Sequence, residues 1–333
     1  MDVLAELAFS TSDLAQVRFA VSPMWEVAPS FRLLRSGAAR SIHRPWIDQV
    51  RPRLLAAGLD RGWLDELIPP GGGYVPDFLN PAPAGPAPAP AAERDAIRAA
   101  PADRVRRDLD HLARHQGTLG PRLRALRDDP PGLLAEVAEE VETYWELALA
   151  PYWARIRAVL DADVLHRARQ AAEHGTGHLL NHLHTSLSWD GDALRMARRK
   201  QPLTRTTAGT GLLLIPSAFT GAGLRTRTAP PDPPQVAYQA RGIGSLWQAR
   251  PVARADALSA VLGRSRTLLL TELEIPASTT QLAHRTGLSP AGVSQYLTAL
   301  RDAGLVSAHR AGRSVLYART TAAEVLLRAA TDH

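Results

Sequence analysis

The sequence predicts a mainly α protein of the α+β class: a large helical N-terminal domain with a small antiparallel sheet, and a smaller C-terminal domain of helices and one hairpin. Apolar residues recur at spacings of three and four through most of residues 91–184, which indicates amphipathic helices. Short alternating or apolar runs between turn residues occupy 186–239, which indicates strands. All seven tryptophans precede residue 250, so we place the domain boundary there and expect domains at 1–250 and 251–333.

The first 60 residues predict one strand and three helices. Residues 4–9 resemble an edge strand, and the polar run 10–13 supplies helix N-cap chemistry before a helix over 14–20. A second helix is expected after Pro23, and a third from Pro45 to Ala57, where apolar residues fall at helical spacing.

The middle of the chain combines a spacer, helices and strands. Residues 80–92 are rich in Pro and Ala and predict an extended connection, with a PxxP peptide ligand as the alternative. Within 91–184 we expect a helix over 133–149 and another from Pro151 to about Ala172. Asp190-Gly191 predicts a hairpin, and buried strands are expected at 212–215 and 236–239, with a proline-rich loop over 227–235 between them.

Composition narrows the functional classes. Lys+Arg 39 against Asp+Glu 33 gives a net charge of +6, and Lys200 is the single lysine, so the positive charge is almost entirely arginine. Arginine suits phosphate and base-edge contacts, although the codon usage of a GC-rich genome explains a high count equally well, so its placement matters more. The chain has no cysteine, which excludes disulfides, thiolate metal ligands and thiol chemistry. A signal-peptide pattern and a membrane-length apolar run are both lacking, so a cytoplasmic protein with no membrane contact is expected.

The most specific pattern lies in the C-terminal domain. Ser278 precedes Gln281 by three residues, as in a capping box, and Ser289-Pro290 is typical of a helix start, with Gly287 providing a sharp turn between them. On the second helix Val293, Leu297 and Leu300 share the inward face, whereas Ala291, Gln295 and Thr298 face outward with Ser294 beside them. This order of elements is typical of a helix-turn-helix that places its second helix in the DNA major groove, where glutamine can bond an adenine edge and methyl groups can contact thymine.

A basic hairpin follows the second helix. Leu305-Val306 starts a strand, residues 311–313 form the tip, and Val315 to Ala318 return. His309, Arg310 and Arg313 are expected at the tip, where a wing meets phosphates or the minor groove. Between Pro276 and Thr320 five arginines stand against Asp302 alone, which concentrates much of the net charge here: Arg285, Arg301, Arg310, Arg313 and Arg319.

These segments resemble a known family. Residues 293–297, 300–306 and 312–317 are similar to the winged helix of ArsR/SmtB-type bacterial transcription regulators, and the resemblance covers roughly 255–330. It implies a homodimer that binds a palindromic operator, usually as a repressor released by an effector. Tyr296 stands where the family often has histidine, and thiolate metal sensing is excluded by the missing cysteines. Residues 18–26 and 76–79 resemble a long N-terminal domain of no known activity, fused ahead of such winged helices in actinobacterial regulators.

The resulting hypothesis is a sequence-specific DNA-binding transcription regulator, a homodimeric effector-responsive repressor whose partners are double-stranded DNA, a second copy and a small-molecule effector. No cofactor or catalytic residue is expected, and the effector site is not indicated. The residues expected to contact DNA are Thr279, Thr280, Ser289, Pro290, Ala291, Ser294, Gln295, Thr298, Arg301, His309, Arg310, Arg313 and Ser314.

Several alternatives stay open. The regulator could be a ligand-independent activator or an architectural DNA-binding protein, or the chain could be an enzyme or a protein-interaction module with an incidental winged helix. His174, His178 and His182 stand four residues apart and are candidate metal ligands, but Gly175 and Gly177 interrupt the helix, so a structural cluster is preferred. The glycines at 209 and 211 precede a strand, whereas a nucleotide-binding motif has them after one. A ligand cavity among the N-terminal aromatic residues is a further hypothesis.

Overall fold

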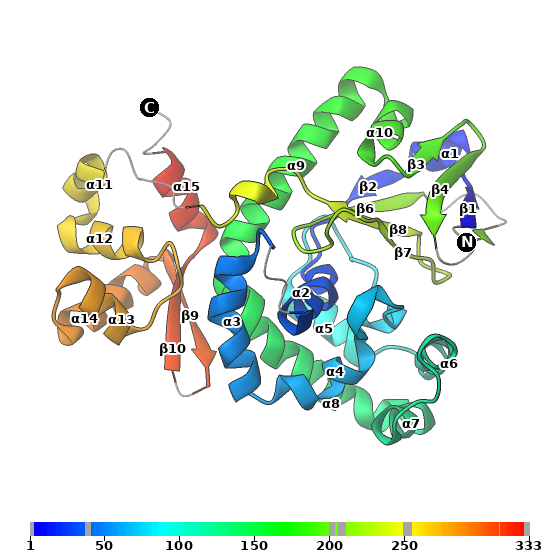
Figure 1. Ribbon diagram of the computed structural model, residues 1–333. Helices are drawn as coiled ribbons and strands as arrows, with labels where there is room; N and C mark the ends of the chain where they lie inside the picture. The colour runs from blue at the N-terminus through cyan, green and yellow to red at the C-terminus, as the bar shows by residue number, and fades with distance from the viewer. Residues whose placement is uncertain are drawn as a thin grey trace. The chain divides into compact units, whose positions relative to one another are not determined.

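The chain forms two compact units (Figure 1). The computed structural model describes residues 3–36, 41–199, 204–205, 211–248, 255–312 and 314–329. Unit 1 consists of Met1–Ser36, Trp63–Glu139 and Val159–Ile243, and unit 2 of Gly37–Gly62, Glu140–Ala158 and Gly244–His333. Unit 2 therefore differs from the expected 251–333 domain, because it also takes in residues 37–62 and 140–158 from the N-terminal part of the chain.

Unit 1 is rich in helices, several of which begin at a proline, where the missing amide hydrogen costs nothing. Its helices are α1 (Thr11–Leu14), α2 (Met24–Ser36), α4 (Trp63–Leu67), α5 (Pro90–Arg98), α6 (Ala102–Gln116), α7 (Pro121–Asp128), most of α8 (Pro130–Tyr144), most of α9 (Trp153–His174) and α10 (Thr176–Leu183), with short 3-10 turns η2 (Pro70–Gly72) and η3 (Asp77–Leu79). The extended connection expected at 80–92 is confirmed up to Ala89, after which α5 begins.

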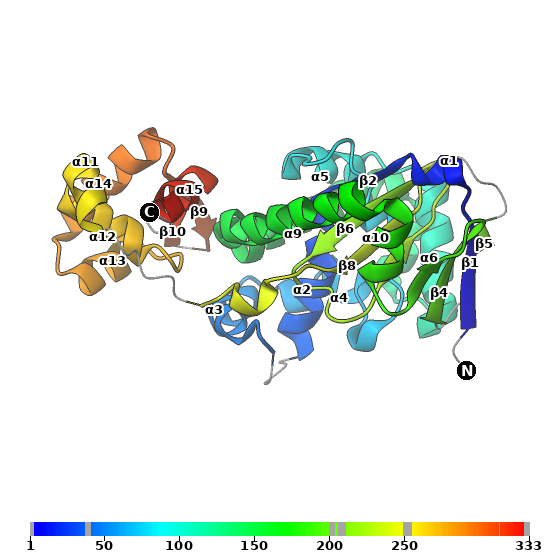
Figure 2. The ribbon, with the colours of Figure 1, turned by 90° about the horizontal axis from the view of Figure 1, so that it is seen from above.

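Two sheets complete unit 1. The first has the order β3 (Leu187–Trp189), β4 (Ala193–Arg199), β1 (Val3–Ala8), β5 (Thr204–Arg205), and its first three strands are antiparallel. The second has the order β2 (Val17–Phe19), β6 (Leu212–Ser217), β8 (Gln235–Gln239), β7 (Arg225–Arg227), and β2, β6 and β8 run parallel. Helix α10 packs beside these strands (Figure 2), and one core joins it to both sheets: Leu7, Phe9, Leu179, Leu180, Leu183, Leu187, Leu194, Met196, Leu212, Leu214, Val236 and Tyr238.

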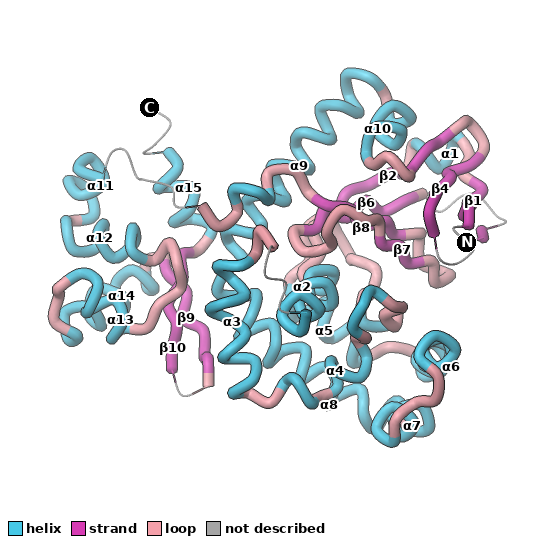
Figure 3. The backbone as a smooth tube through the Cα atoms, viewed as in Figure 1, coloured by secondary structure: helices cyan, strands magenta, loops and turns pink. Residues whose placement is uncertain are grey.

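The class prediction, mainly α with some β-structure, is confirmed (Figure 3). The hairpin at Asp190-Gly191 and the strands near 4–9, 212–215 and 236–239 are also confirmed. The first of these is not the edge strand that was expected, because β1 pairs with β4 on one side and β5 on the other. The helix expected over 14–20 is wrong. The capping box of Ser10 and Asp13 starts a helix that ends at Leu14, and Val17–Phe19 is strand β2, because it pairs in register with Leu212–Leu214.

Unit 1 buries carboxyl groups within polar cages. Glu26 accepts hydrogen bonds from the amides of Ala218 and Phe219 and from Ser217 Oγ, and burial raises its pKa to about 7. Glu93 on α5 accepts from Ser22 Oγ at 2.7 Å and from the Met24 amide at 3.0 Å, and so ties α5 to the start of α2. Burial likewise raises the pKa of Glu93 to about 7, although the two hydrogen bonds lower it.

Glu93 predicts a pH-dependent stability. Because its pKa rises from 4.5 to about 7 on folding, the folded state holds a proton that the unfolded chain releases, so this stabilisation is complete below pH 4.5 and is lost as pH rises to about 7. Glu93→Gln keeps an acceptor for the Met24 amide and offers a donor to Ser22 Oγ, but it cannot titrate. Between pH 4.5 and 7 the wild type is expected to lose stability of the order of 2 kcal/mol through this group, and the variant is expected not to show this loss. Urea unfolding at a series of pH values measures the free energy of unfolding of both proteins. If that free energy depended on pH in the variant as it does in the wild type, the prediction would be wrong.

Unit 2 joins the C-terminal elements to two earlier segments. These segments supply α3 (Arg44–Ala56), η1 (Leu59–Arg61), the π-helical turn η4 (Trp145–Leu149), η5 (Ala150–Tyr152) and the start of α9, and η6 (Ile243–Ser245) follows at the junction. Trp46 Nε1 donates to the carbonyl oxygen of Ala148 at 2.8 Å, and the Trp46 and Trp247 rings stack with centroids 6.5 Å apart. The C-terminal elements are α11 (Ala255–Leu262), α12 (Arg264–Glu272), α13 (Thr279–Thr286), α14 (Pro290–Asp302), β9 (Val306–Ala311), β10 (Ser314–Arg319) and α15 (Thr321–Ala329).

None of the helices in the described ranges is long and apolar enough to cross a membrane.

Candidate nucleic-acid interface

Helices α13 and α14 form a helix-turn-helix whose ends are set by local caps. Ser278 Oγ accepts from the Gln281 amide and the Gln281 side chain accepts from the Ser278 amide at 2.9 Å, which completes the capping box that the sequence indicates. Gly287 ends α13 at φ 71°, a conformation that favours glycine. Ser289 Oγ then accepts from the Gly292 amide at 3.1 Å and starts α14.

The inward face of α14 is the one that the spacing predicts. Val293, Leu297 and Leu300 are buried and pack with leucines of α12 and α13 in the core of this part of unit 2. That packing fixes the rotation of α14 about its axis, so the opposite face is presented to solvent.

The outward face of α14 consists of small or polar exposed side chains. Among the described residues Gln295 makes no side-chain hydrogen bond, so its amide is available to a base edge, whereas Thr298 Oγ1 donates to the Ser294 carbonyl at 3.0 Å and leaves its methyl group outward. Arg301 is exposed with its Nε 3.9 Å from Asp302, a weak pair that leaves the guanidinium free to meet phosphate. The exposed residues of the predicted set here are Ser289, Pro290, Ala291, Ser294, Gln295, Thr298 and Arg301.

Helix α13 adds a basic surface that the sequence analysis did not include in the site. Thr280 is exposed and Thr279 is half-buried, and an open hollow of about 300 Å³ is lined by Thr280, Gln281, His284 and Arg285. His284 and Arg285 are exposed in the last turn of α13. The sequence could have indicated His284 and Arg285, because both lie in the turn of helix just before Gly287.

Strands β9 and β10 form the expected wing, and its two faces differ. The register pairs Leu316 with His309 and Val315 with Arg310, so Arg310 and Val315 share one face, and both are exposed. Ser314 is also exposed. Arg313 lies outside the described residues.

Two basic residues of the wing strands, His309 of the predicted site and Arg319 of the counted arginines, are engaged within the protein. The His309 side chain is only 14% exposed, and its Nδ1 lies 3.1 Å from Glu146 Oε2, so it is not free at the tip as expected. Arg319 is buried: its guanidinium donates to the carbonyl oxygens of Leu270 and Thr271, both at 2.6 Å, and burial lowers its pKa while Glu324 opposes that shift. The positive charge of the wing surface is therefore smaller than the arginine count indicates.

The histidine cluster is a separate feature of unit 1. The rings of His174 and His178 have centroids 4.9 Å apart, and those of His178 and His182 stack at 3.9 Å. His182 Nδ1 lies 2.9 Å from the carbonyl oxygen of His178, which engages one ring nitrogen. In the described parts of the chain no group of three or more His, Cys, Asp or Glu side chains could hold a metal ion.

Comparison with protein families finds two separate matches along the chain. Residues 86–244 match a family of unknown function (DUF5937), and residues 268–308 match the family described as bacterial regulatory protein, arsR family. The latter range begins in α12 and includes α13, α14 and the first residues of β9.

One curated relative matches part of the chain. Over 64 residues the chain is 42% identical to the HTH-type transcriptional regulator NmtR of Mycobacterium tuberculosis, a stretch that covers 19% of this chain and 53% of that protein. The chain thus spans about half the length of the curated relative. No solved structure matches it. The C-terminal part of this chain is therefore an arsR-family helix-turn-helix domain, and a DUF5937 domain precedes it.

Proposed function

We propose that the protein is a sequence-specific DNA-binding transcription regulator that acts in the cytoplasm as a homodimeric, effector-responsive repressor. The observation that carries the proposal is the outward face of α14, where Gln295 stands exposed among small side chains on a helix whose rotation is fixed by a buried apolar face. Such a surface allows close approach to base edges in a major groove. The arsR-family match and the similarity to NmtR, an HTH-type transcriptional regulator, support the same function.

The homodimer and the response to an effector are supported by different observations. A homodimer is supported by exposed apolar side chains on α11 and α15, Val261 and Val325, which a second copy would cover. Two recognition helices about one DNA turn, roughly 34 Å, apart would then read a palindromic operator. Effector response is supported by the size of the DUF5937 domain, which contact with DNA does not require. The effector acts by shifting the population of the spacing that fits DNA. The proposal includes no enzymatic activity and no cofactor.

A binding assay on the full chain tests DNA recognition, with duplexes from its own upstream region and of random sequence across a salt series. Arg310→Ala is expected to weaken binding to both duplexes alike and to reduce the salt slope by about 1, because we assign the exposed Arg310 a phosphate contact. Gln295→Ala is expected to weaken the specific complex about tenfold and the random one little, because a bidentate base contact is lost.

Arg124→Ala, which removes an exposed arginine from α7, is the matched control and should bind like the wild type. Absence of binding at low salt would refute the regulator and favour an enzyme or an interaction module. Binding without sequence preference would favour an architectural protein, and sedimentation of the unbound chain tests the dimer.

A further inference from the structure

One face of the wing is covered by a segment from the middle of the chain. Strand β9 contacts η4 and η5, and β10 contacts η5, all within unit 2. On the face of His309, both Leu316 and Ala318 are buried, whereas Arg310 and Val315 on the opposite face are exposed. A two-stranded hairpin is marginally stable by itself, so this cover determines where the wing lies.

A chain of polar contacts fastens the segment to both strands of the wing. Glu146 of η4 accepts from His309 Nδ1 at 3.1 Å. Ser307 Oγ lies 2.8 Å from the other ring nitrogen of His309 and 3.3 Å from the Ala318 carbonyl oxygen of β10. Glu146 is itself 41% exposed, so it reaches the wing from the solvent edge of the segment.

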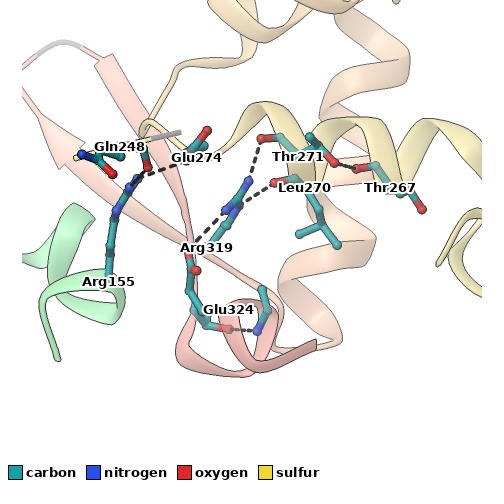
Figure 4. A network of polar contacts seen from close by, with 10 residues as sticks. Arg155, Gln248, Thr267, Leu270, Thr271, Glu274, Arg319 and Glu324 are labelled. Carbon is teal, nitrogen blue, oxygen red and sulfur yellow. Dashed lines mark hydrogen bonds and ion pairs between the residues drawn. The ribbon is translucent and has the colours of Figure 1, made fainter. Parts of the chain in front are cut away.

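A second contact lies at the start of α9 (Figure 4). Arg155 pairs with Glu274 at 3.4 Å and also donates to the Gln248 carbonyl. Glu274 lies in the loop between α12 and α13, and Arg319 of β10 binds the last carbonyls of α12 beside it. The segment therefore holds the wing and the loop that leads into the helix-turn-helix.

We propose that Glu146 is a positioning residue for DNA binding: by holding His309 on the covered face of β9, it presents Arg310 on the opposite face to the phosphate backbone. The proposal rests on the proposed DNA-binding function. Glu146 and Arg155 both lie within the 86–244 range of the DUF5937 match.

Two neutral variants separate position from charge. Glu146→Gln removes the carboxylate, which itself repels DNA, but keeps an oxygen that accepts from His309, whereas Glu146→Ala removes both. On a random-sequence duplex at low salt, Glu146→Ala is expected to bind about fivefold more weakly than Glu146→Gln, the effect of one hydrogen bond. When Arg310→Ala is added to each, the difference should disappear, because the residue that Glu146 positions is gone. If Glu146 only stabilised the fold, the difference between the two variants would remain in the Arg310→Ala background.

Two further variants keep the test decisive. His309→Ala breaks the same bond from the wing but keeps the Glu146 carboxylate, so its reference is the wild type, and it should bind about fivefold more weakly than the wild type. This pair replaces the Glu146 variants if η4 does not fold without Glu146. Glu136→Ala, which removes an exposed carboxylate of α8 that has no partner among the described residues, should not weaken binding. Equal affinities of Glu146→Ala and Glu146→Gln, or a difference that survives Arg310→Ala, would overturn the proposal. Wild-type protein that does not bind DNA would instead overturn the proposed function.

Discussion

Replacing Gln295 with glutamate is expected to weaken binding to the specific duplex by about a hundredfold, because a carboxylate on the outward face of α14 meets phosphates and acceptor-rich base edges. The side chain is exposed and lies apart from the buried face formed by Val293, Leu297 and Leu300, so folding should be unaffected. Equilibrium binding measures the loss, and thermal unfolding shows whether the domain is intact.

Gln116→Glu is the matched control, since Gln116 is an exposed residue of α6 in unit 1 and its substitution changes the net charge equally. It should change affinity by less than about twofold, the size expected of a screened distant charge. If Gln295→Glu bound DNA as the wild type does, α14 would not be the recognition helix, and the docking proposed above would be abandoned.

Arg319→Ala is expected to lower the free energy of unfolding of unit 2 by about 3–5 kcal/mol, because it breaks a buried charge network and leaves its partners unpaired. The carbonyl oxygens of Leu270 and Thr271 would lose their donor, and Glu324, only 14% exposed, would lose its countercharge. Arg319→Lys should lie between, since an ammonium keeps the charge but lacks the planar fork that reaches both carbonyls.

Urea unfolding measures the effect, and Arg328→Ala supplies the comparison. Arg328 is an exposed arginine of α15, and its loss should change stability by less than about 0.5 kcal/mol. A result for Arg319→Ala close to that of Arg328→Ala would mean that the buried network contributes nothing to folding.

Much of the interface could be predicted because its signals are local. The caps at Ser278 and Ser289 and the turn at Gly287 depend on neighbours within a few residues, and the buried face of α14 follows from helical spacing alone. A single helix and its ends can therefore be read from a short window of sequence.

The failures share a cause in long-range pairing. Val17–Phe19 is a strand because it pairs with residues 212–214, which no local pattern reveals. His309 on the covered face of the wing contacts Glu146, and Arg319 is buried against the end of α12. His309, which resembled an exposed DNA contact in the sequence, therefore has a structural role, because its partner Glu146 comes from a distant segment.

The covered face of the wing bears on how such regulators can be recombined. A C-terminal piece cut near residue 250 would leave behind the segment that covers Leu316 and Ala318, and would carry an apolar surface into its new context. In this chain the DNA-reading module is discontinuous in sequence, so a functional graft needs residues 37–62 and 140–158 as well as 244–333. Such a graft would therefore carry part of the DUF5937 range, residues 140–158, together with the helix-turn-helix.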